Sequence, residues 1–300
     1  MKTTYRPLLS VLLPVHEGED FLEETLESVI NQTFSDFELI ILDNLSTDNS
    51  AKIIKKFQHK DSRIKYILDS KRRNGNDCFS ELVKYAEAEY CVTINDDNIL
   101  DPNFFFILFN NIKNQDHYHW AITNGTYINK EKKKIKSFFD NRCYLEGKIN
   151  IYKIILFYFR GDVIPLLLPS ICKTEIFRSL LPYINLSKFE NDSDTLMGFK
   201  VLSNLNIKYM QQELIFIRVY ENHQRYHSFK IPTQHLSFIY EKIFHEINLL
   251  MHLWYVLVKS RLFILKKIFL ICFLPILMVA KTIKIFLYKI ASLIKSIAFK

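Results

Sequence analysis

Short apolar runs alternate with amphipathic segments through the first third of the chain, and this alternation limits the possible folds more than any other feature. The apolar runs are expected strands and occupy residues 8–13, 37–42, 64–68 and 90–94. The expected helices between them carry apolar residues at helical spacing; they occupy residues 21–32, the stretch with Ile53, Ile54 and Phe57, and residues 77–86. Strands that alternate with helices at such short intervals predict an α/β fold with a doubly wound, mostly parallel sheet.

Polar residues stand where three of these expected strands end. Pro14, Val15, His16 and Glu17 follow the first strand, Asp43 follows the second, and Asp96 and Asp97 follow the fourth. Because the carboxyl ends of parallel strands meet at one edge of a sheet, these residues are expected to form one site.

The acidic pair in Asn95-Asp96-Asp97-Asn98 is the sharpest chemical signal. Two adjacent carboxylates after a buried strand repel each other and are costly to desolvate, and a hard divalent cation relieves both problems. The alternative is a plain strand-to-helix turn in which Asp101-Pro102 starts the next helix. That alternative explains Asp101 but gives no role to Asp96 and Asp97.

The pattern is weaker after about residue 115. Residues 120–126 and 214–219 resemble strands, whereas the strongly apolar stretch 151–182 fits no single element. The run NKEKKKIK at 129–136 is interpreted as a solvated loop, with phosphate binding as the alternative.

Composition and charge separate a body from a tail. The chain has 300 residues, 49% of them hydrophobic, and five cysteines without metal-finger spacing, which indicates buried, reduced thiols. The net charge is +8, but the nine Lys and Arg residues after Glu246 face no acid, so the body is nearly neutral. A basic nucleic-acid-binding face is therefore not expected. The brief N-terminal apolar run, which contains Pro14, predicts no signal peptide.

The tail, residues 254–300, is rich in Leu, Ile and Phe with lysines between them. Its longest uncharged run, residues 268–280, is shorter than the roughly 20 residues of a membrane span. Residues 283–297 place their apolar side chains on one helical face, which is typical of a helix lying on an anionic membrane surface. The alternative is a helical hairpin that packs on the body or joins subunits.

The stretch SVLLPVHEGEDFLEETLESVINQTFSDFELIILDNLSTDNS resembles the opening of a family 2 glycosyltransferase with the GT-A fold. The shared features are the Pro-Val turn, the Ser-Val-x-x-Gln-Thr helix end, and Asp43 followed by Ser46-Thr47-Asp48. The resemblance continues through Asn95-Asp96-Asp97, which looks like the family's Asp-x-Asp motif, and through residues 190–220. It implies a GT-A domain over residues 1–225, with a nucleotide-sugar half to about 115 and an acceptor half from 116, before a membrane-associating tail at 226–300.

The resemblance also implies nucleotide contacts. Asp43 would contact the nucleobase, and Asp96 or Asn95 would contact the ribose or a metal-bound water. The turn from Pro14 through Val15 to Glu17 would hold the base with its main chain. Asn74 lies where the family often touches the nucleotide, with a flexible turn as the alternative. The first Asp of the usual motif is Asn95 here, which sets this chain apart from the family pattern.

The expected chemistry needs a cation and a base. Asp97 is the expected ligand of Mn²⁺ or Mg²⁺, which would neutralise the departing diphosphate. The acceptor hydroxyl must lose a proton, and the candidate bases are Glu190, Asp192 and Asp194, with Asp194 favoured and Asp192 next; helix capping is their alternative role. Two further residues are candidate diphosphate contacts: Arg218, with a surface role as the alternative, and His223, since Tyr220 stands where the family has His.

The sequence thus predicts an inverting, metal-dependent glycosyltransferase. Its partners would be a nucleotide-sugar donor, a glycan or glycolipid acceptor of lipopolysaccharide or capsule type, and the cytoplasmic face of a bacterial inner membrane, with no nucleic acid. The alternative is a non-catalytic sugar- or nucleotide-binding subunit on the same fold.

Overall fold

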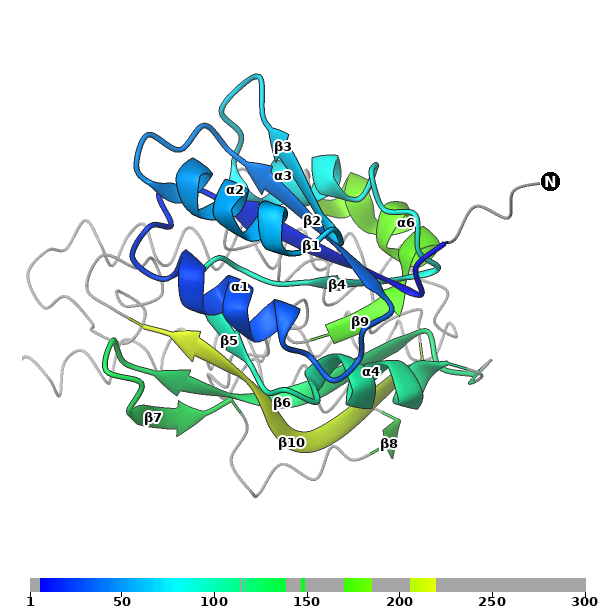
Figure 1. Ribbon diagram of the computed structural model, residues 1–300. Helices are drawn as coiled ribbons and strands as arrows, with labels where there is room; N and C mark the ends of the chain where they lie inside the picture. The colour runs from blue at the N-terminus through cyan, green and yellow to red at the C-terminus, as the bar shows by residue number, and fades with distance from the viewer. Residues whose placement is uncertain are drawn as a thin grey trace, which may run out of the picture.

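The structure, a computed structural model, describes residues 6–113, 115, 117–138, 147–148, 170–184 and 206–219 (Figure 1). These residues form one 10-stranded sheet with the strand order β3-β2-β1-β4-β9-β6-β10-β5. Two short strands lie off this path, since β7 pairs with β6 and β8 pairs with β10.

The first half of the sheet is the parallel α/β unit that the sequence predicts. Its elements are β1 (Leu9–Val15), α1 (Leu22–Ile30), β2 (Phe37–Asp43), α2 (Ser50–Lys60), β3 (Ile64–Leu68), α3 (Gly75–Leu82) and β4 (Tyr90–Thr93). Strands β3, β2, β1 and β4 are all parallel neighbours. Every residue of β2 is buried, as expected of a strand covered on both faces.

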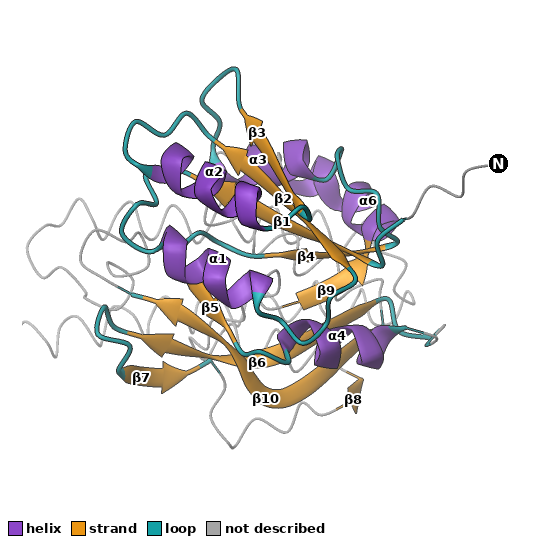
Figure 2. Ribbon diagram, viewed as in Figure 1, coloured by secondary structure: helices purple, strands orange, loops and turns teal. Residues whose placement is uncertain are grey.

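Helices cover this parallel half (Figure 2). Helices α1 and α2 lie side by side in front of the strands in this view. Helix α3 packs on β1 and β2 and also contacts α6 (Thr174–Ile184). This cover leaves β1 and β2 buried almost throughout, the polar residues Ser10, Glu38 and Asp43 included.

The second half of the sheet is mixed rather than parallel. It contains β5 (Asn98–Leu100), α4 (Phe104–Ile112), β6 (Trp120–Ile128), β7 (Lys134–Ser137), β8 (Gly147–Lys148), β9 (Ser170–Lys173) and β10 (Ile207–Arg218). Strand β9 lies between β4 and β6 and is antiparallel to both, whereas β6 and β10 are parallel. The prediction of a mostly parallel sheet therefore holds for the first half only. In the second half the antiparallel strand β9 interrupts it, and β9 lies in the stretch 151–182, to which the sequence assigned no element.

Part of the predicted basic loop is a strand. Residues 134–137 form β7, which pairs with β6, although the side chains from 130 to 136 are exposed as expected of a solvated segment. Glu213 on β10 helps to hold β7 against β6, because its side chain bonds to residues of both strands. Its carboxylate accepts from Thr126 Oγ1 at 2.5 Å and pairs with Lys134 Nζ at 2.8 Å.

The helix-end motif of α1 ties that helix to α4. Gln32 donates from Nε2 to the Asp101 carbonyl at 2.7 Å, and its Oε1 accepts from Phe105 N at 3.0 Å. Gln32 thus supplies the acceptor that a capping residue normally supplies. Helix α4 begins at Phe104, later than predicted, because Asp101–Phe104 first form a turn closed by the Phe104 N to Asp101 carbonyl bond at 2.9 Å, and the Asp101 carboxylate accepts from Asn103 N within it.

The cysteines that the structure describes are buried free thiols, as the composition predicts. Cys91 and Cys172 face each other across β4 and β9 with their sulfurs 3.8 Å apart, which their distance in sequence did not indicate. Burial raises the pKa of Cys78 to about 12 and raises that of Cys172, so both thiols stay protonated near neutral pH.

Gly125 in β6 is required by close packing. A Cβ at this position would lie 2.3 Å from the Phe138 ring and 2.7 Å from Ile215 Cγ2. We therefore expect Gly125→Ala to lower the free energy of unfolding by about 1–3 kcal/mol in a urea titration.

Gly75 provides the matched control. It lies at the start of α3, and a Cβ there meets nothing within 4 Å. Gly75→Ala is expected to leave stability unchanged or to raise it by up to about 1 kcal/mol. A Gly125→Ala variant as stable as the unmodified protein would show that this contact is not tight.

Candidate functional site

The carboxyl ends of β1, β2 and β4 meet at one edge of the sheet, as the sequence predicts. Val15 and Asp43 are register partners, and His16 N donates to Asp96 Oδ2 at 3.1 Å. Gly18 lies against the same carboxylate, since a Cβ there would be 3.0 Å from Asp96 Oδ2. His16 and Asp96 are 80 positions apart in the sequence, and the pairing of β1 with β4 brings them to the same edge.

The loops after β1 and β2 are joined by hydrogen bonds. Glu17, which has a left-handed φ of 52°, donates from N to Ser46 Oγ at 3.2 Å, and its Oε1 accepts from Thr47 N at 2.7 Å. Gly18 N donates to Ser50 Oγ at 2.9 Å. The Glu17 carboxylate thus joins the two loops. The turn after β1 would therefore contact a ligand through its main-chain groups.

Asp43 lies beneath this edge with 0% of its surface exposed. Its Oδ2 accepts from the Tyr66 hydroxyl at 3.0 Å, and its Oδ1 accepts from Ser46 N at 2.9 Å. Burial and the Asp43 carboxylate raise the pKa of Tyr66 to about 12, so the phenol remains a donor. Asp43 therefore orients the loop after β2, and a direct contact with a nucleobase, which stays a prediction, requires a neighbouring group to move.

Sequence reasoning missed the residues that hold the segment before α3. Asn44 Oδ1 accepts from Arg73 N, and Asn44 Nδ2 donates to the Arg73 carbonyl, both at 2.8 Å. Arg73 Nε also pairs with the buried Asp69 at 2.5 Å. The position of Asn44 directly after Asp43 was the available signal. Asn74, predicted to touch a nucleotide, is exposed and caps α3 by accepting from Asp77 N at 2.8 Å.

The acidic turn follows β4. Asp96 is partly exposed, whereas Asp97 is buried and accepts from Asn98 Nδ2 at 3.0 Å. Asn95 N donates to Asn98 Oδ1 at 2.9 Å, which closes the turn. Burial, together with the neighbouring Asp97 carboxylate, raises the pKa of Asp96 to about 7. The two carboxylates are therefore held close together at an electrostatic cost that a bound cation would remove.

These residues fit a divalent cation that also binds a phosphorylated ligand. Within the described ranges no cluster of three or more His, Cys, Asp or Glu side chains could hold a metal alone. Mg²⁺ commonly binds through one or two carboxylates, with waters and substrate phosphates completing its shell, and Asp96 and Asp97 match that donor set. The acidic pair therefore fits a cation whose other ligands are waters and phosphate oxygens.

Arg218 is the last residue of β10, and its side chain contacts the acidic turn. It is 1% exposed, pairs with Glu24 and donates from Nη1 to the Asp97 carbonyl at 3.1 Å. The surface role considered for Arg218 is therefore wrong, while its contact with a diphosphate stays a prediction.

The remaining predicted residues lie outside the part of the chain that the structure describes. They are the candidate bases Glu190, Asp192 and Asp194, the candidate diphosphate contact His223, and the tail at 226–300. Their roles stay predictions. Among the helices that the structure describes, none is long and apolar enough to cross a membrane.

Known proteins with similar sequences include bacterial and archaeal glycosyltransferases. Glycosyltransferase GlyG of Streptococcus pneumoniae is 26% identical over 122 residues, covering 41% of this chain and 40% of that protein. A Campylobacter jejuni protein, GalNAc(5)-diNAcBac-PP-undecaprenol beta-1,3-glucosyltransferase, is 26% identical over 57% of this chain and 55% of its own. The matched segments thus span about half or less of these relatives.

A similar fold occurs in Staphylococcus aureus TarS. Its structure in complex with UDP-GlcNAc superposes with a TM-score of 0.62 at 17% identity, covering 86% of this chain and 69% of that one. At this identity the likeness shows the fold alone, and it supports the GT-A-like α/β arrangement of the mixed sheet.

The sequence profile of glycosyl transferase family 2 matches residues 10–168, more than half of the chain. The matched segment includes the joined loops after β1 and β2 and the acidic turn after β4, the features that the sheet brings to one edge. Profile, fold and site geometry agree, and the chain belongs to glycosyl transferase family 2.

Proposed function

We propose that this protein transfers a sugar from a nucleotide-sugar donor to a hydroxyl group of a bacterial surface glycan, with inversion at the anomeric carbon. The observation that carries the proposal is the acidic pair Asp96 and Asp97, held at the edge where β1, β2 and β4 end. The Campylobacter jejuni relative supports the reaction type, since its name describes glucosyl transfer to an undecaprenol-diphosphate-linked glycan. The UDP-GlcNAc complex of TarS supports a nucleotide-sugar donor.

The donor side of the reaction uses the described residues. Asp97, with Asp96 beside it, would hold Mn²⁺ or Mg²⁺, which supplies charge neutralisation to a diphosphate leaving group. The turn from Pro14 to Glu17 would hold the nucleobase with its main chain. This turn is already fixed, because Glu17 bonds to Thr47 in the loop after β2, and Asp43 orients that loop. Since these groups are fixed in advance, little of the binding energy is lost to ordering them.

The acceptor side requires a carboxylate base. The acceptor oxygen forms a bond to the anomeric carbon while the bond from that carbon to the diphosphate oxygen breaks, and the hydroxyl proton passes to the base. Attack from the face opposite the leaving group inverts the configuration. Asp194 is the proposed base and Asp192 the second candidate, from the family resemblance of residues 190–220.

Calorimetric titration with a panel of nucleoside diphosphates and nucleotide sugars tests the donor site. We expect binding of one nucleotide class, and tighter binding with Mn²⁺ than with EDTA. The absence of binding to any member, with or without metal, would contradict the proposal. Binding without any turnover would instead support the non-catalytic sugar- or nucleotide-binding subunit.

We also propose that the tail brings the enzyme to the cytoplasmic face of an anionic membrane, where lipid-linked acceptors lie. Removal of residues 254–300 is expected to abolish co-sedimentation with anionic vesicles and to leave nucleotide binding intact, because the described site lies before residue 220. Each basic residue near an anionic surface contributes about 1 kcal/mol, so binding of the full chain should weaken as salt rises. A full chain that does not bind anionic vesicles would contradict this role. It would favour the alternative, a helical hairpin that packs on the body or joins subunits.

A further inference from the structure

Two buried side chains on other elements donate hydrogen bonds to the backbone of the acidic turn. Thr25 in α1 donates from Oγ1 to the Asp96 carbonyl at 2.9 Å. Arg218 at the end of β10 donates from Nη1 to the Asp97 carbonyl at 3.1 Å. The carbonyl of each acidic residue thus has its own side-chain donor.

The Arg218 side chain has no freedom to turn toward solvent. It is 1% exposed, its second Nη atom pairs with Glu24, and its guanidinium stacks 4.5 Å from the centre of the Phe21 ring. Its Nε has no hydrogen-bond partner among the described residues, so the Nη contacts with Glu24 and Asp97 set its orientation. A buried guanidinium is costly unless it is paired, which makes the position of Glu24 decisive for that of Arg218.

Glu24 connects this group to the β6–β7 hairpin. Its Oε1 pairs with Lys132 Nζ at 2.5 Å, and Lys132 has a left-handed φ of 62°. Register places the base of the hairpin beside Arg218, because Ile128 is the β6 partner of Arg218. Lys132 is largely exposed, so its contribution to the position of Glu24 is smaller than that of Arg218.

We infer that Arg218, fixed by Glu24, is a positioning residue: it holds the Asp97 backbone and thereby the Asp97 carboxylate, which would bind the cation. This inference rests on the proposed metal-dependent donor site and assigns Arg218 an action through Asp97 rather than on the ligand. The competing explanation is an ion pair that serves stability alone. The two differ in whether loss of Arg218 selectively weakens metal-dependent binding.

The test combines calorimetry with hydrogen exchange on the full chain. The probes are UDP and Mn²⁺, and the first quantity is the gain in UDP affinity that Mn²⁺ produces. Arg218→Lys keeps the charge but cannot reach both Glu24 and the Asp97 carbonyl, so this gain is expected to fall about tenfold. UDP affinity in EDTA should change by no more than about twofold. Amides of residues 95–98 should exchange at least about fivefold faster.

Glu24→Gln gives a second variant that removes the charge and keeps one acceptor oxygen, which can still bond to Arg218. It should hold Arg218 less firmly, because a bond to a neutral amide oxygen is weaker than one to a carboxylate, and so lower the Mn²⁺-dependent gain about three- to fivefold. It also keeps the inference testable if Arg218→Lys fails to fold, which thermal unfolding would reveal.

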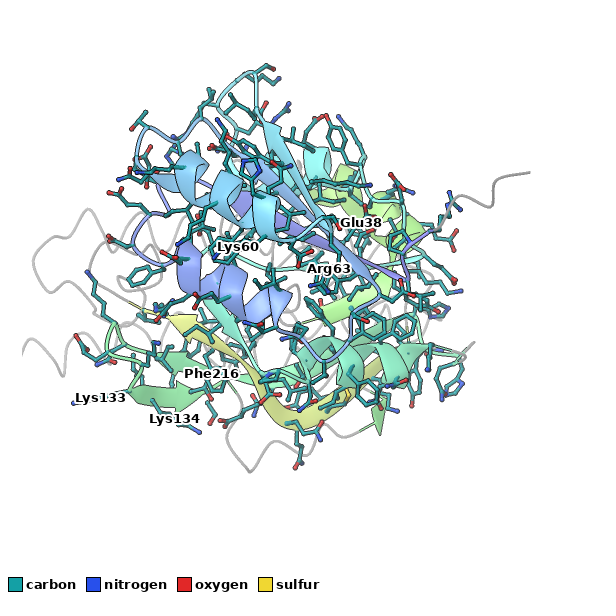
Figure 3. All side chains as sticks on the ribbon, viewed as in Figure 1. Glu38, Lys60, Arg63, Lys133, Lys134 and Phe216 are labelled. Carbon is teal, nitrogen blue, oxygen red and sulfur yellow. The ribbon has the colours of Figure 1, made fainter. Side chains whose placement is uncertain are left out.

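Arg63 provides a matched control, labelled in Figure 3. It too stacks on an aromatic ring, 4.1 Å from the centre of Phe37, pairs with a carboxylate on Asp61, and donates to the Ile30 carbonyl at 3.0 Å. It precedes β3, at the amino end of the strands. Arg63→Lys should leave both the Mn²⁺-dependent gain and the exchange at 95–98 unchanged.

The outcomes separate the inference from the proposed function. If Arg218→Lys and Glu24→Gln fold and both keep the unmodified gain and exchange rates, the positioning role is wrong and the donor site stands. If the unmodified protein shows no Mn²⁺-dependent gain, the proposed metal site fails, and exchange alone decides the positioning role. Unchanged exchange at 95–98 would then overturn it, and faster exchange confined to the two site variants would support it.

Discussion

Asp97→Asn should lower kcat by roughly a hundredfold or more and should remove most of the metal dependence of donor binding. The carboxylate is the stronger ligand for a hard cation, and an amide in its place offers one neutral oxygen. The fold should survive, because Asp97 accepts from Asn98 Nδ2 and an asparagine oxygen can accept the same bond. Steady-state kinetics across a Mn²⁺ series would measure both effects.

Asp101→Asn is the control for that variant. Asp101 lies in the same segment but bonds to Asn103 N at 2.9 Å, away from the strand edge. Its replacement should leave kcat and metal dependence unchanged. An Asp97→Asn enzyme with ordinary turnover at low Mn²⁺ would remove the metal role from Asp97.

Asp194→Asn should reduce transfer by about 10²–10⁴-fold while donor affinity stays nearly constant. The reason is that the base acts on the acceptor hydroxyl, and general-base catalysis typically contributes that much. Rapid-quench measurement of transfer, paired with calorimetric donor affinity, would separate the two quantities.

Asp192→Asn is the informative comparison, since the same resemblance places both residues near the acceptor. Transfer that collapses in Asp192→Asn and survives in Asp194→Asn would move the base by two positions. If both variants transfer sugar at the ordinary rate, the base lies elsewhere in the chain.

The sequence predicted the parallel half of the fold well because its signals there are local. Each strand from β1 to β4 is an apolar run, and each helix between them has an apolar stripe, so short-range patterns suffice. The meeting of Val15, Asp43 and Asp96 at one edge then follows from the rule that carboxyl ends of parallel strands lie together.

The mixed half could not be predicted because its strands depend on distant partners. Strand β9 has four residues and is defined by antiparallel pairing with β4 and β6. Strand β7 is charged and exposed, and the contact of Lys134 with Glu213 on β10 helps to hold it in place. No local pattern contains those partners.

The same limit applied within the site. Arg218 had the appearance of a ligand or surface residue, because only the fold shows that it lies buried behind Asp97. The pairing of Asn44 with Arg73 and of Tyr66 with Asp43 joins residues 29 and 23 positions apart. The first contact depends on loop geometry and the second on the pairing of β2 with β3, and the local sequence pattern specifies neither.

Release of nucleoside diphosphate from a panel of nucleotide sugars, measured with Mn²⁺ or Mg²⁺ and with EDTA, tests the central claim most directly. We expect the full chain to hydrolyse one donor slowly even without acceptor, and we expect both EDTA and the Asp97→Asn substitution to remove that activity. Tight binding of a donor with no release of nucleoside diphosphate under any metal, in the presence of lipid-linked and soluble glycan acceptors, would contradict the assignment of this chain as an active glycosyltransferase.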